Sequence, residues 1–154
     1  MDTKGVFSNL LTEGEFISRI KYELKRAERY RIFLSLAIFN FGPVVDMAGN
    51  GSFETEEDRA RFMNQINEVV KDSVREIDAV SNTNHIKVGL LMPETSRQGA
   101  EAVAQRLAGT LTGYCSDYFG KPDGFLIPIE ISSFPDASGA KSIASYLEEL
   151  TGPE

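Results

Sequence analysis

Arg75 and Asp78 are the pair of side chains whose types and spacing most strongly suggest a site in this sequence. They belong to the segment Arg75-Glu76-Ile77-Asp78, at the end of a stretch with helical apolar periodicity. Residues three apart on a helix lie on one face, so the guanidinium and the carboxylate are placed to form an ion pair. On a surface such a pair contributes about 0.3–0.5 kcal/mol to stability. By residue type alone, the pair therefore predicts an exposed structural contact.

Two further groups of polar residues are candidates for chemistry. His85 is the only histidine and lies in a polar segment, where a turn residue is the ordinary interpretation. Glu54, Glu56, Glu57 and Asp58 form an acidic cluster. Carboxylates at a helix N-terminus offset the positive end of the helix dipole, and a metal site is the less favoured alternative. The sequence has no GxxxxGK[ST] phosphate loop, no GxGxxG fingerprint and no nucleophile elbow.

Length and charge exclude several classes of function. The chain of 154 residues is one domain's worth of material, so residues 1–154 are expected to form a single domain with its own core. The net charge is −7 and there is no basic block. Because the phosphate backbone of a nucleic acid must be neutralised by cations, we expect no nucleic-acid partner.

Cysteine usage and hydropathy point to a cytoplasmic protein. The single Cys115 excludes an internal disulfide and a multi-cysteine metal cage, and it suits a reducing compartment. No apolar run approaches the roughly 18–20 residues that cross a bilayer, and the N-terminal segment carries too much charge for a signal peptide. We therefore expect no membrane insertion, in a chain that is either whole or part of a longer protein.

The first half of the chain shows clear element signals. Thr12 and Glu15 have the spacing of a capping box, and apolar residues follow at helical spacing, which predicts a helix over residues 12–29. Residues 32–41 are almost wholly apolar and predict a strand covered on both faces. Thr55 is placed to cap a second helix that ends near Ile77 or Asp78. The aromatic residues at core-like positions are interpreted as packing: Phe33, Phe39, Phe41 and Phe62.

The remaining predicted elements follow in order. They are a loop at 42–53, a hairpin of 79–80 and 86–92 around a polar tip at 81–85, a helix begun by Ser96, a loop at 114–124, a strand over 127–132, and a last helix with Ile143, Ala144, Leu147 and Leu150 inward. Pro128 cannot donate to a ladder, so its strand is expected at a sheet edge. The predicted fold class is α/β, of the α+β kind, with a central, mainly antiparallel sheet flanked by helices, two of them on one face.

The segment from Asp78 to Pro93, DAVSNTNHIKVGLLMP, resembles the core segment of GGDEF domains, the diguanylate cyclase family. The family's usual pattern is close to DxVARYGGDEFAVLLP. The two segments have equal length with no gap, and Asp78, Val80, Leu91 and Pro93 match or nearly match. The neighbouring helices and strands follow in the family's order over residues 10–150. The resemblance implies a nucleotidyl-cyclase-like fold and a role in bacterial signal transduction.

The departures from the family pattern concern the catalytic positions. The family's signature has two glycines and then an acidic residue that helps to bind the metal. The residues at the signature positions are here Asn84, His85, Ile86, Lys87 and Val88. The family's first-strand D-x-D metal motif aligns with Asn40-Phe41-Gly42, which has no carboxylate. Two-metal phosphoryl transfer needs these carboxylates. The resemblance therefore implies a degenerate domain that is not an enzyme and has no metal cofactor.

Arg75 and Asp78 correspond in register to the R-x-x-D inhibitory site, which begins nine residues before the signature in many GGDEF domains. In the family this site binds cyclic di-GMP. An arginine fork can donate two hydrogen bonds to guanine O6 and N7, and a carboxylate can accept from the guanine N–H edge. The leading hypothesis is therefore a cyclic di-GMP receptor that binds through Arg75 and Asp78, with Arg26, Arg29 and Arg31 as candidates for a second arginine.

Two alternatives stay open. The chain is a nucleotide-independent module for dimerisation or for docking of a partner protein, in which case the R-x-x-D pair is a relic of descent. The loss of both metal motifs and the charge of −7 favour this reading. The less favoured alternative is a residual nucleotide-using enzyme in which Glu54 or Asp58 supplies a carboxylate.

Overall fold

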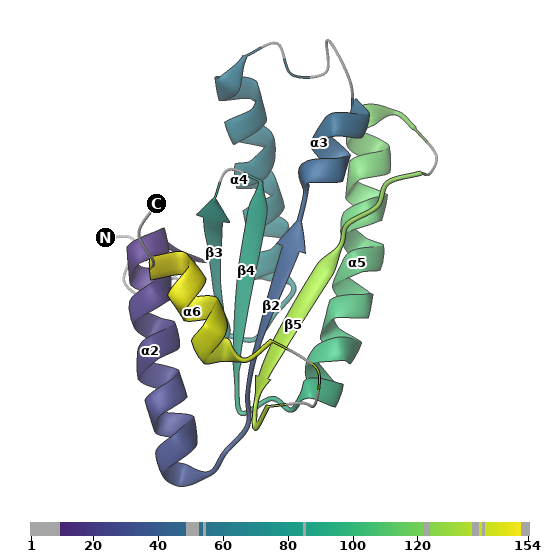
Figure 1. Ribbon diagram of the computed structural model, residues 1–154. Coiled ribbons are helices and arrows are strands. Elements are labelled where there is room, and N and C mark those ends of the chain that lie inside the picture. Colours follow the sequence, from purple (N-terminus) through teal and green to yellow (C-terminus); the bar gives the residue numbers. More distant parts are fainter. Residues whose placement is uncertain are drawn as a thin grey trace, which may run out of the picture.

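The computed structural model describes residues 10–48, 53, 55–84, 86–121, 124–136, 139 and 141–151. Over these residues the chain has the predicted α/β fold, with a five-stranded sheet in the order β1-β3-β4-β2-β5 (Figure 1). The strands are β1 (Leu10–Leu11), β2 (Leu34–Asn40), β3 (Ala79–Asn84), β4 (Lys87–Pro93) and β5 (Ile129–Phe134). The helices are α2 (Glu13–Tyr30), α3 (Gly42–Ala48), α4 (Glu56–Asp72), α5 (Arg97–Phe119) and α6 (Ile143–Thr151).

Strand β2 is the apolar strand of the sequence, and it lies between β4 and β5 with antiparallel pairing to both. The hairpin strands β3 and β4 are also antiparallel, whereas the short β1 runs parallel to β3. The sheet is therefore mainly antiparallel, as expected. Strand β5 lies at the edge with Pro128 just before its first residue, which agrees with the missing N–H of proline.

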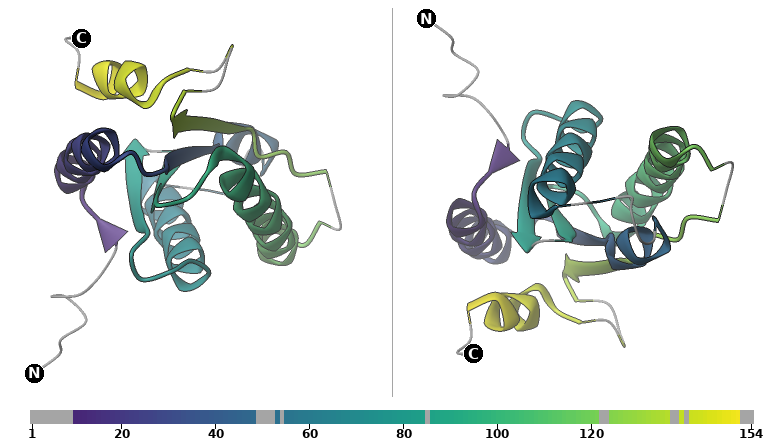
Figure 2. Two further views of the ribbon diagram at one scale, coloured as in Figure 1. Left: turned by 90° about the horizontal axis from the view of Figure 1, so that it is seen from below. Right: turned by 90° about the horizontal axis from the view of Figure 1, so that it is seen from above.

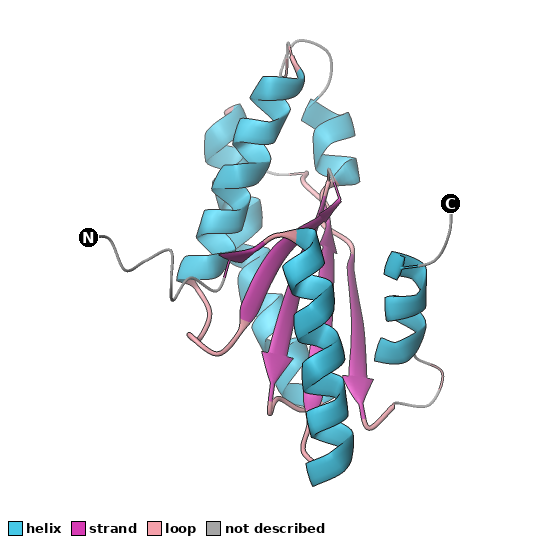
Figure 3. Ribbon diagram, turned by 90° about the vertical axis from the view of Figure 1, so that its left-hand side faces the viewer, coloured by secondary structure: helices cyan, strands magenta, loops and turns pink. Residues whose placement is uncertain are grey.

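Helices cover both faces of the sheet, as the end-on views show (Figure 2). Helices α4 and α5 pack on one face around Phe39 and Phe62. Helices α2 and α6 pack on the other around Leu36 and Phe16, and α2 runs along the strands (Figure 3). The sequence predicted two helices on one face. The structure has a second pair, α2 and α6, which buries the opposite face of β2. This explains why β2 carries apolar residues on both of its faces.

The three longest helices begin where the capping residues predicted. Thr12 and Glu15 form a complete capping box on α2, Thr55 accepts from the N–H of Asp58 on α4, and Ser96 accepts from the N–H of Gly99 on α5. These oxygens satisfy amides that have no partner within the helix. Among the helices that the structure describes, none combines the length and apolar character needed to cross a membrane.

Two predicted loops are helical. Helix α3 occupies most of the segment at 42–53, because Pro43 lies in its first turn, where a missing N–H costs no hydrogen bond. Helix α5 continues through 114–119, since Cys115 is buried on its inner face, and it ends at Gly120 with a φ of 69°. The Gly49-Asn50-Gly51 turn lies outside the described residues.

Three side chains differ from their expected environments. Ser81 was expected in the hairpin tip, but it is buried within β3, which continues to Asn84. Phe33 precedes β2 and is 52% exposed, so it is not a core residue. Ala144 is exposed, and Tyr146 takes a buried position on α6 in its place.

Candidate functional site

The segment Arg75–Asp78 forms a turn and not the end of a helix. Helix α4 ends at Asp72, five residues before the expected Ile77. Ser73 caps it, donating its backbone N–H to Val70 O at 3.0 Å and its hydroxyl to Val69 O at 2.7 Å. A serine that bonds the preceding turn in this way competes with continued helix. The backbone then reverses, and the N–H of Asp78 donates to the carbonyl of Arg75 at 3.0 Å.

The carboxylate of Asp78 is buried and fully engaged by Arg75. Its side chain is 5% exposed, so the expectation of an exposed ion pair is wrong for this partner. Asp78 Oδ2 accepts from the backbone N of Arg75 at 3.0 Å and from its Nε at 3.3 Å. Asp78 Oδ1 accepts from Arg75 Nη2 at 2.9 Å. The carboxylate therefore fixes both the turn and the direction of the arginine side chain.

Arg75 is also attached to the end of β4. Its Nη2 donates to Pro93 O at 2.9 Å and to Thr95 Oγ1 at 2.7 Å, and the Thr95 hydroxyl donates to Pro93 O at 3.1 Å. The Arg75 side chain is still 52% exposed. The protein therefore fixes the direction of a side chain that still reaches solvent, which preorganises it for a planar ligand.

A second arginine reaches this turn from α5, a predicted helix whose arginines were not among the sequence candidates. Arg106 of α5 donates from Nη1 to Ser73 O at 3.2 Å, two residues before Arg75. Arg106 immediately precedes the buried Leu107, so it lies beside the core face of α5. The packing of α4 against α5 brings Arg106 to the carbonyl of Ser73, and periodicity within one helix carries no signal of that packing.

The arginines suspected from the sequence lie on or next to α2. Arg26 pairs with Glu23 at 3.1 Å and with Glu94 at 3.2 Å, and these carboxylates raise its pKa. Arg26 is connected to the turn only indirectly, because its partner Glu94 is the chain neighbour of Thr95, which accepts from Arg75. Arg29 lies over the ring of Tyr30, at 5.5 Å from its centroid.

The two segments aligned with the family's catalytic motifs meet at the other end of the sheet. Asn40 pairs with Lys87 across β2 and β4, and the N–H of Phe41 donates to Ile86 O at 2.7 Å. A side chain on Gly42 would begin 3.1 Å from Ile86 Cδ1, so the approach is close. The backbone of Asn84 ends β3, while its side chain and all of His85 lie outside the described residues.

The groups that meet there are an amide, an ammonium and an aliphatic side chain, from Asn40, Lys87 and Ile86. The residues of the acidic cluster serve the helix instead. Asp58 lies in the first turn of α4 and accepts from Arg61 at 3.0 Å, whereas Glu54 lies outside the described residues. Among the described residues, no group of three or more His, Cys, Asp or Glu could hold a metal ion.

Comparison with known proteins identifies the fold. No family profile and no curated protein matches this sequence. Solved structures do match, with low sequence identity. A diguanylate cyclase protein from Thermotoga maritima is 13% identical with a TM-score of 0.67, over 94% of this chain and 95% of that one. The FimX GGDEF domain from Pseudomonas aeruginosa is 15% identical with a TM-score of 0.62, over 92% and 82% of the two chains.

A third match is the active GGEEF domain of a diguanylate cyclase from Vibrio cholerae, 14% identical with a TM-score of 0.55, over 84% of this chain and 79% of that one. At these identities the likeness shows the fold alone. The chain therefore has a GGDEF-like fold, which confirms the fold that the sequence resemblance implied.

Proposed function

We propose that this chain is a non-catalytic domain of GGDEF-like fold that binds cyclic di-GMP at the turn formed by Arg75 and Asp78. The observation that supports it is the half-exposed Arg75 side chain, held in one direction by Asp78, Pro93 and Thr95. Because the protein already fixes this side chain, a ligand does not have to order it on binding.

The geometry divides the work between the residues of the turn. Because Nε and Nη2 of Arg75 already bond Asp78, Pro93 and Thr95, the guanidinium contacts the guanine base by lying flat against it. Asp78 positions Arg75, since its own oxygens are buried and already accept three N–H groups. This differs from the expectation that the carboxylate contacts the guanine directly. Arg106 supplies a second cation beside the turn, suited to a ligand phosphate.

The proposal that the domain is not a cyclase rests on residue types at the other end of the sheet. Asn40 and Ile86 stand at positions where the family pattern has carboxylates, and Lys87 adds a positive charge between them. Phosphoryl transfer assisted by two metals needs anionic oxygens to hold the cations. The neutral amide of Asn40 offers no negative charge to a metal cation, and the ammonium of Lys87 repels one. We therefore propose no metal cofactor and no turnover of GTP.

Isothermal titration with cyclic di-GMP tests the receptor function. We expect micromolar or tighter binding by the unaltered chain and a loss of about tenfold or more, equal to about 1.4 kcal/mol, in Arg75→Lys. The lysine keeps a cation beside Asp78 but lacks the fork. Arg61→Lys is the matched control, because Arg61 pairs with Asp58 at the same spacing on an exposed helix face.

Three outcomes decide between the proposals. Loss in Arg75→Lys with unchanged binding in Arg61→Lys supports the site. Equal affinity in both variants contradicts it, provided that their thermal midpoints show folded protein. Formation of any cyclic dinucleotide from GTP with Mg²⁺ or Mn²⁺ above the blank contradicts the non-catalytic assignment.

A second candidate function is a nucleotide-independent interaction module. The observation that favours it is the exposure of two aromatic residues close together in the chain, Tyr30 at 60% and Phe33 at 52%. Contiguous exposed apolar side chains are typical of contacts between proteins, so this function requires the two rings to share one surface. We expect light scattering to show a stable dimer that Phe33→Asp dissociates, with or without cyclic di-GMP, if this function is the correct one.

A further inference from the structure

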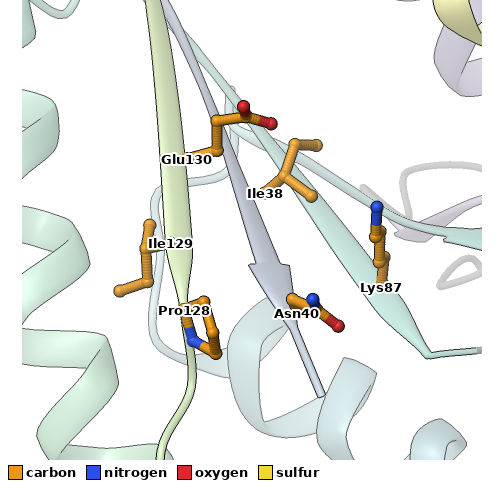
Figure 4. Close-up of a pocket in the computed structure, with 6 residues that line it drawn as sticks. All are labelled: Ile38, Asn40, Lys87, Pro128, Ile129 and Glu130. Carbon is orange, nitrogen blue, oxygen red and sulfur yellow. The ribbon is translucent and has the colours of Figure 1, made fainter. Parts of the chain in front are cut away.

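A pocket lies at each end of β5. The pocket of about 320 Å³ at the start of the strand includes Asn40 and Lys87, which belong to the segments aligned with the catalytic motifs, and is therefore part of the region already described (Figure 4). The pocket of about 220 Å³ at the end of the strand, between Leu24 and Phe134, belongs to neither site described above. We call it the β5-end pocket.

Three elements form the β5-end pocket: α2, the end of β5 and the start of α6. The two helices cover the same face of the sheet and contact each other (Figure 2). Leu24, Phe134 and Ile143 supply an apolar wall, since all three belong to the hydrophobic core of that face or pack against it. Glu28 of α2 and Asp136, two residues after β5, supply carboxylates. The pocket therefore combines an apolar wall with two negative charges.

The local structure places the apolar groups beneath the charged ones. Leu24 and Glu28 are four residues apart on α2 and so lie on one face of the helix, with Leu24 half-buried and Glu28 exposed. Asp136 is exposed as well, whereas Ile143 is buried. Ser142 fixes the start of α6, because its hydroxyl accepts from the N–H of Ser145 at 3.0 Å. A ligand entering from solvent meets the carboxylates and then the apolar wall.

The two carboxylates have no counterion in the described part of the chain. Neither Glu28 nor Asp136 forms an ion pair or a hydrogen bond there. Lys141 precedes α6, but its ammonium pairs with Glu130 and Glu149 instead. Two carboxylates without a cation, beside an apolar wall, attract a positively charged group and repel an anion.

The size of the pocket indicates what kind of cation it takes. About 220 Å³ is below the range of roughly 300–1,000 Å³ for sites that bind whole small molecules. A long basic side chain is smaller, and it combines an aliphatic stem with a charged end. Such side chains are common anchors of protein interfaces, where arginine is enriched. The guanidinium or ammonium also donates hydrogen bonds to carboxylates.

We propose that the β5-end pocket receives a basic side chain, arginine or lysine, from a partner protein. The stem of the side chain contacts Leu24, Phe134 and Ile143, and its charged end lies between Glu28 and Asp136. This makes the face formed by α2 and α6 a docking surface for a basic segment. The inference does not rest on the proposed function, because the same carboxylates repel the phosphates of cyclic di-GMP.

An NMR titration of backbone amides tests the proposal with three capped amino acids as probes. These are the methylamides of acetyl-arginine, acetyl-lysine and acetyl-citrulline, of which citrulline has nearly the shape of arginine without its charge. We expect saturable shifts at Leu24, Glu28, Phe134 and Ala144 with at least one of the two basic probes. The citrulline probe is expected to bind about tenfold more weakly than the arginine probe, because it forms only neutral hydrogen bonds.

Two variants remove the charges and keep the shapes. Glu28→Gln and Asp136→Asn are each expected to weaken the basic probe about two- to fivefold, the range of an exposed ion pair, and about tenfold together. Glu148→Gln is the matched control, because Glu148 is an exposed carboxylate of α6 that does not line the pocket. All three residues are exposed, and the amide spectrum shows directly whether each variant is folded.

The outcomes decide the proposal as follows. Loss of binding in the double variant, with unchanged binding in Glu148→Gln, supports it, and the tighter of the two basic probes then identifies the side chain. Absence of saturable shifts with both basic probes overturns it, as does equal affinity for citrulline and arginine or unchanged binding in the double variant. If light scattering shows a dimer that the double variant dissociates, the side chain comes from a second copy and the assignment to another protein is wrong.

The same variants separate this pocket from the proposed function. If both proposals hold, Arg75→Lys binds the basic probe normally, and the double variant of Glu28 and Asp136 binds cyclic di-GMP normally. Failure of the receptor function therefore leaves the probe titration unaffected, and failure of the probe titration leaves cyclic di-GMP binding unaffected.

Discussion

Replacing Asp78 by asparagine tests whether the turn depends on a buried charge. The asparagine side chain has the same shape, but it offers one oxygen and one NH₂ group in place of two oxygens. In the structure the two oxygens accept three N–H groups of Arg75, at 3.0, 3.3 and 2.9 Å. In either orientation of the amide, at least one N–H of Arg75 faces another donor at the buried position of the Asp78 side chain.

The expected cost follows from burial and charge. A hydrogen bond to a charged group contributes about 1.5–3 kcal/mol, and removal of one partner leaves the other unsatisfied. Loss of a partner from a fully buried pair costs about 3–5 kcal/mol, but Arg75 is half exposed and water can reach it. We therefore expect Asp78→Asn to lower the free energy of unfolding by about 2–3 kcal/mol. For a chain of this size that corresponds to about 4–12 °C in the thermal midpoint.

Urea unfolding with an unchanged slope measures this difference. Asp58→Asn is the matched control, because Asp58 and Arg61 form a pair with the same spacing that is exposed on both sides. We expect the control to cost less than about 1 kcal/mol. Equal losses in the two variants, within about 0.5 kcal/mol, would refute the reasoning that burial of Asp78 makes the turn structural.

Three further outcomes are expected. Burial raises the pKa of Cys115 to about 11, above its unfolded value of about 8.5, so the urea midpoint should fall as pH rises from about 8.5 towards 11 and fall less in Cys115→Ala. Thr12→Ala should cost about 1 kcal/mol in urea unfolding, and Thr12→Ser should recover most of it, because the capping oxygen returns. Thr95→Val removes an acceptor from Arg75 Nη2, so titration should show cyclic di-GMP bound a few-fold more weakly, with a change in unfolding free energy below about 1 kcal/mol.

Local signals in the sequence were sufficient for most of the fold. The capping oxygens of Thr12, Thr55 and Ser96 act within a few residues of their own position, so spacing alone located the starts of α2, α4 and α5. The apolar run of β2 similarly indicated a strand covered on both faces. The short β1 has only two residues and shows no period that a sequence pattern could reveal.

Interpretation failed where one residue type serves two purposes. Proline after glycine at 42–43 suggested a loop, yet the same proline suits the first turn of α3. Apolar periodicity continued past Ser73 and suggested a longer α4, but the side chain of Ser73 bonds the preceding turn and ends the helix. The pair Arg75 and Asp78 was found by its spacing, whereas its burial depends on β4 and on Thr95, which lie far along the chain.

The burial of Asp78 changes what the R-x-x-D pair can say about function. A chain that binds no nucleotide still has a reason to keep both residues, because together they close the turn between α4 and β3. Presence of the pair is therefore compatible with a receptor and with a relic. Arg106 separates a receptor from a relic better. Its replacement removes only the bond from α5 to Ser73 O, and the three bonds between Arg75 and Asp78 stay intact. A ligand-binding role for the turn must involve the exposed surface of Arg75 and its neighbours, and the buried carboxylate acts only through the arginine that it holds.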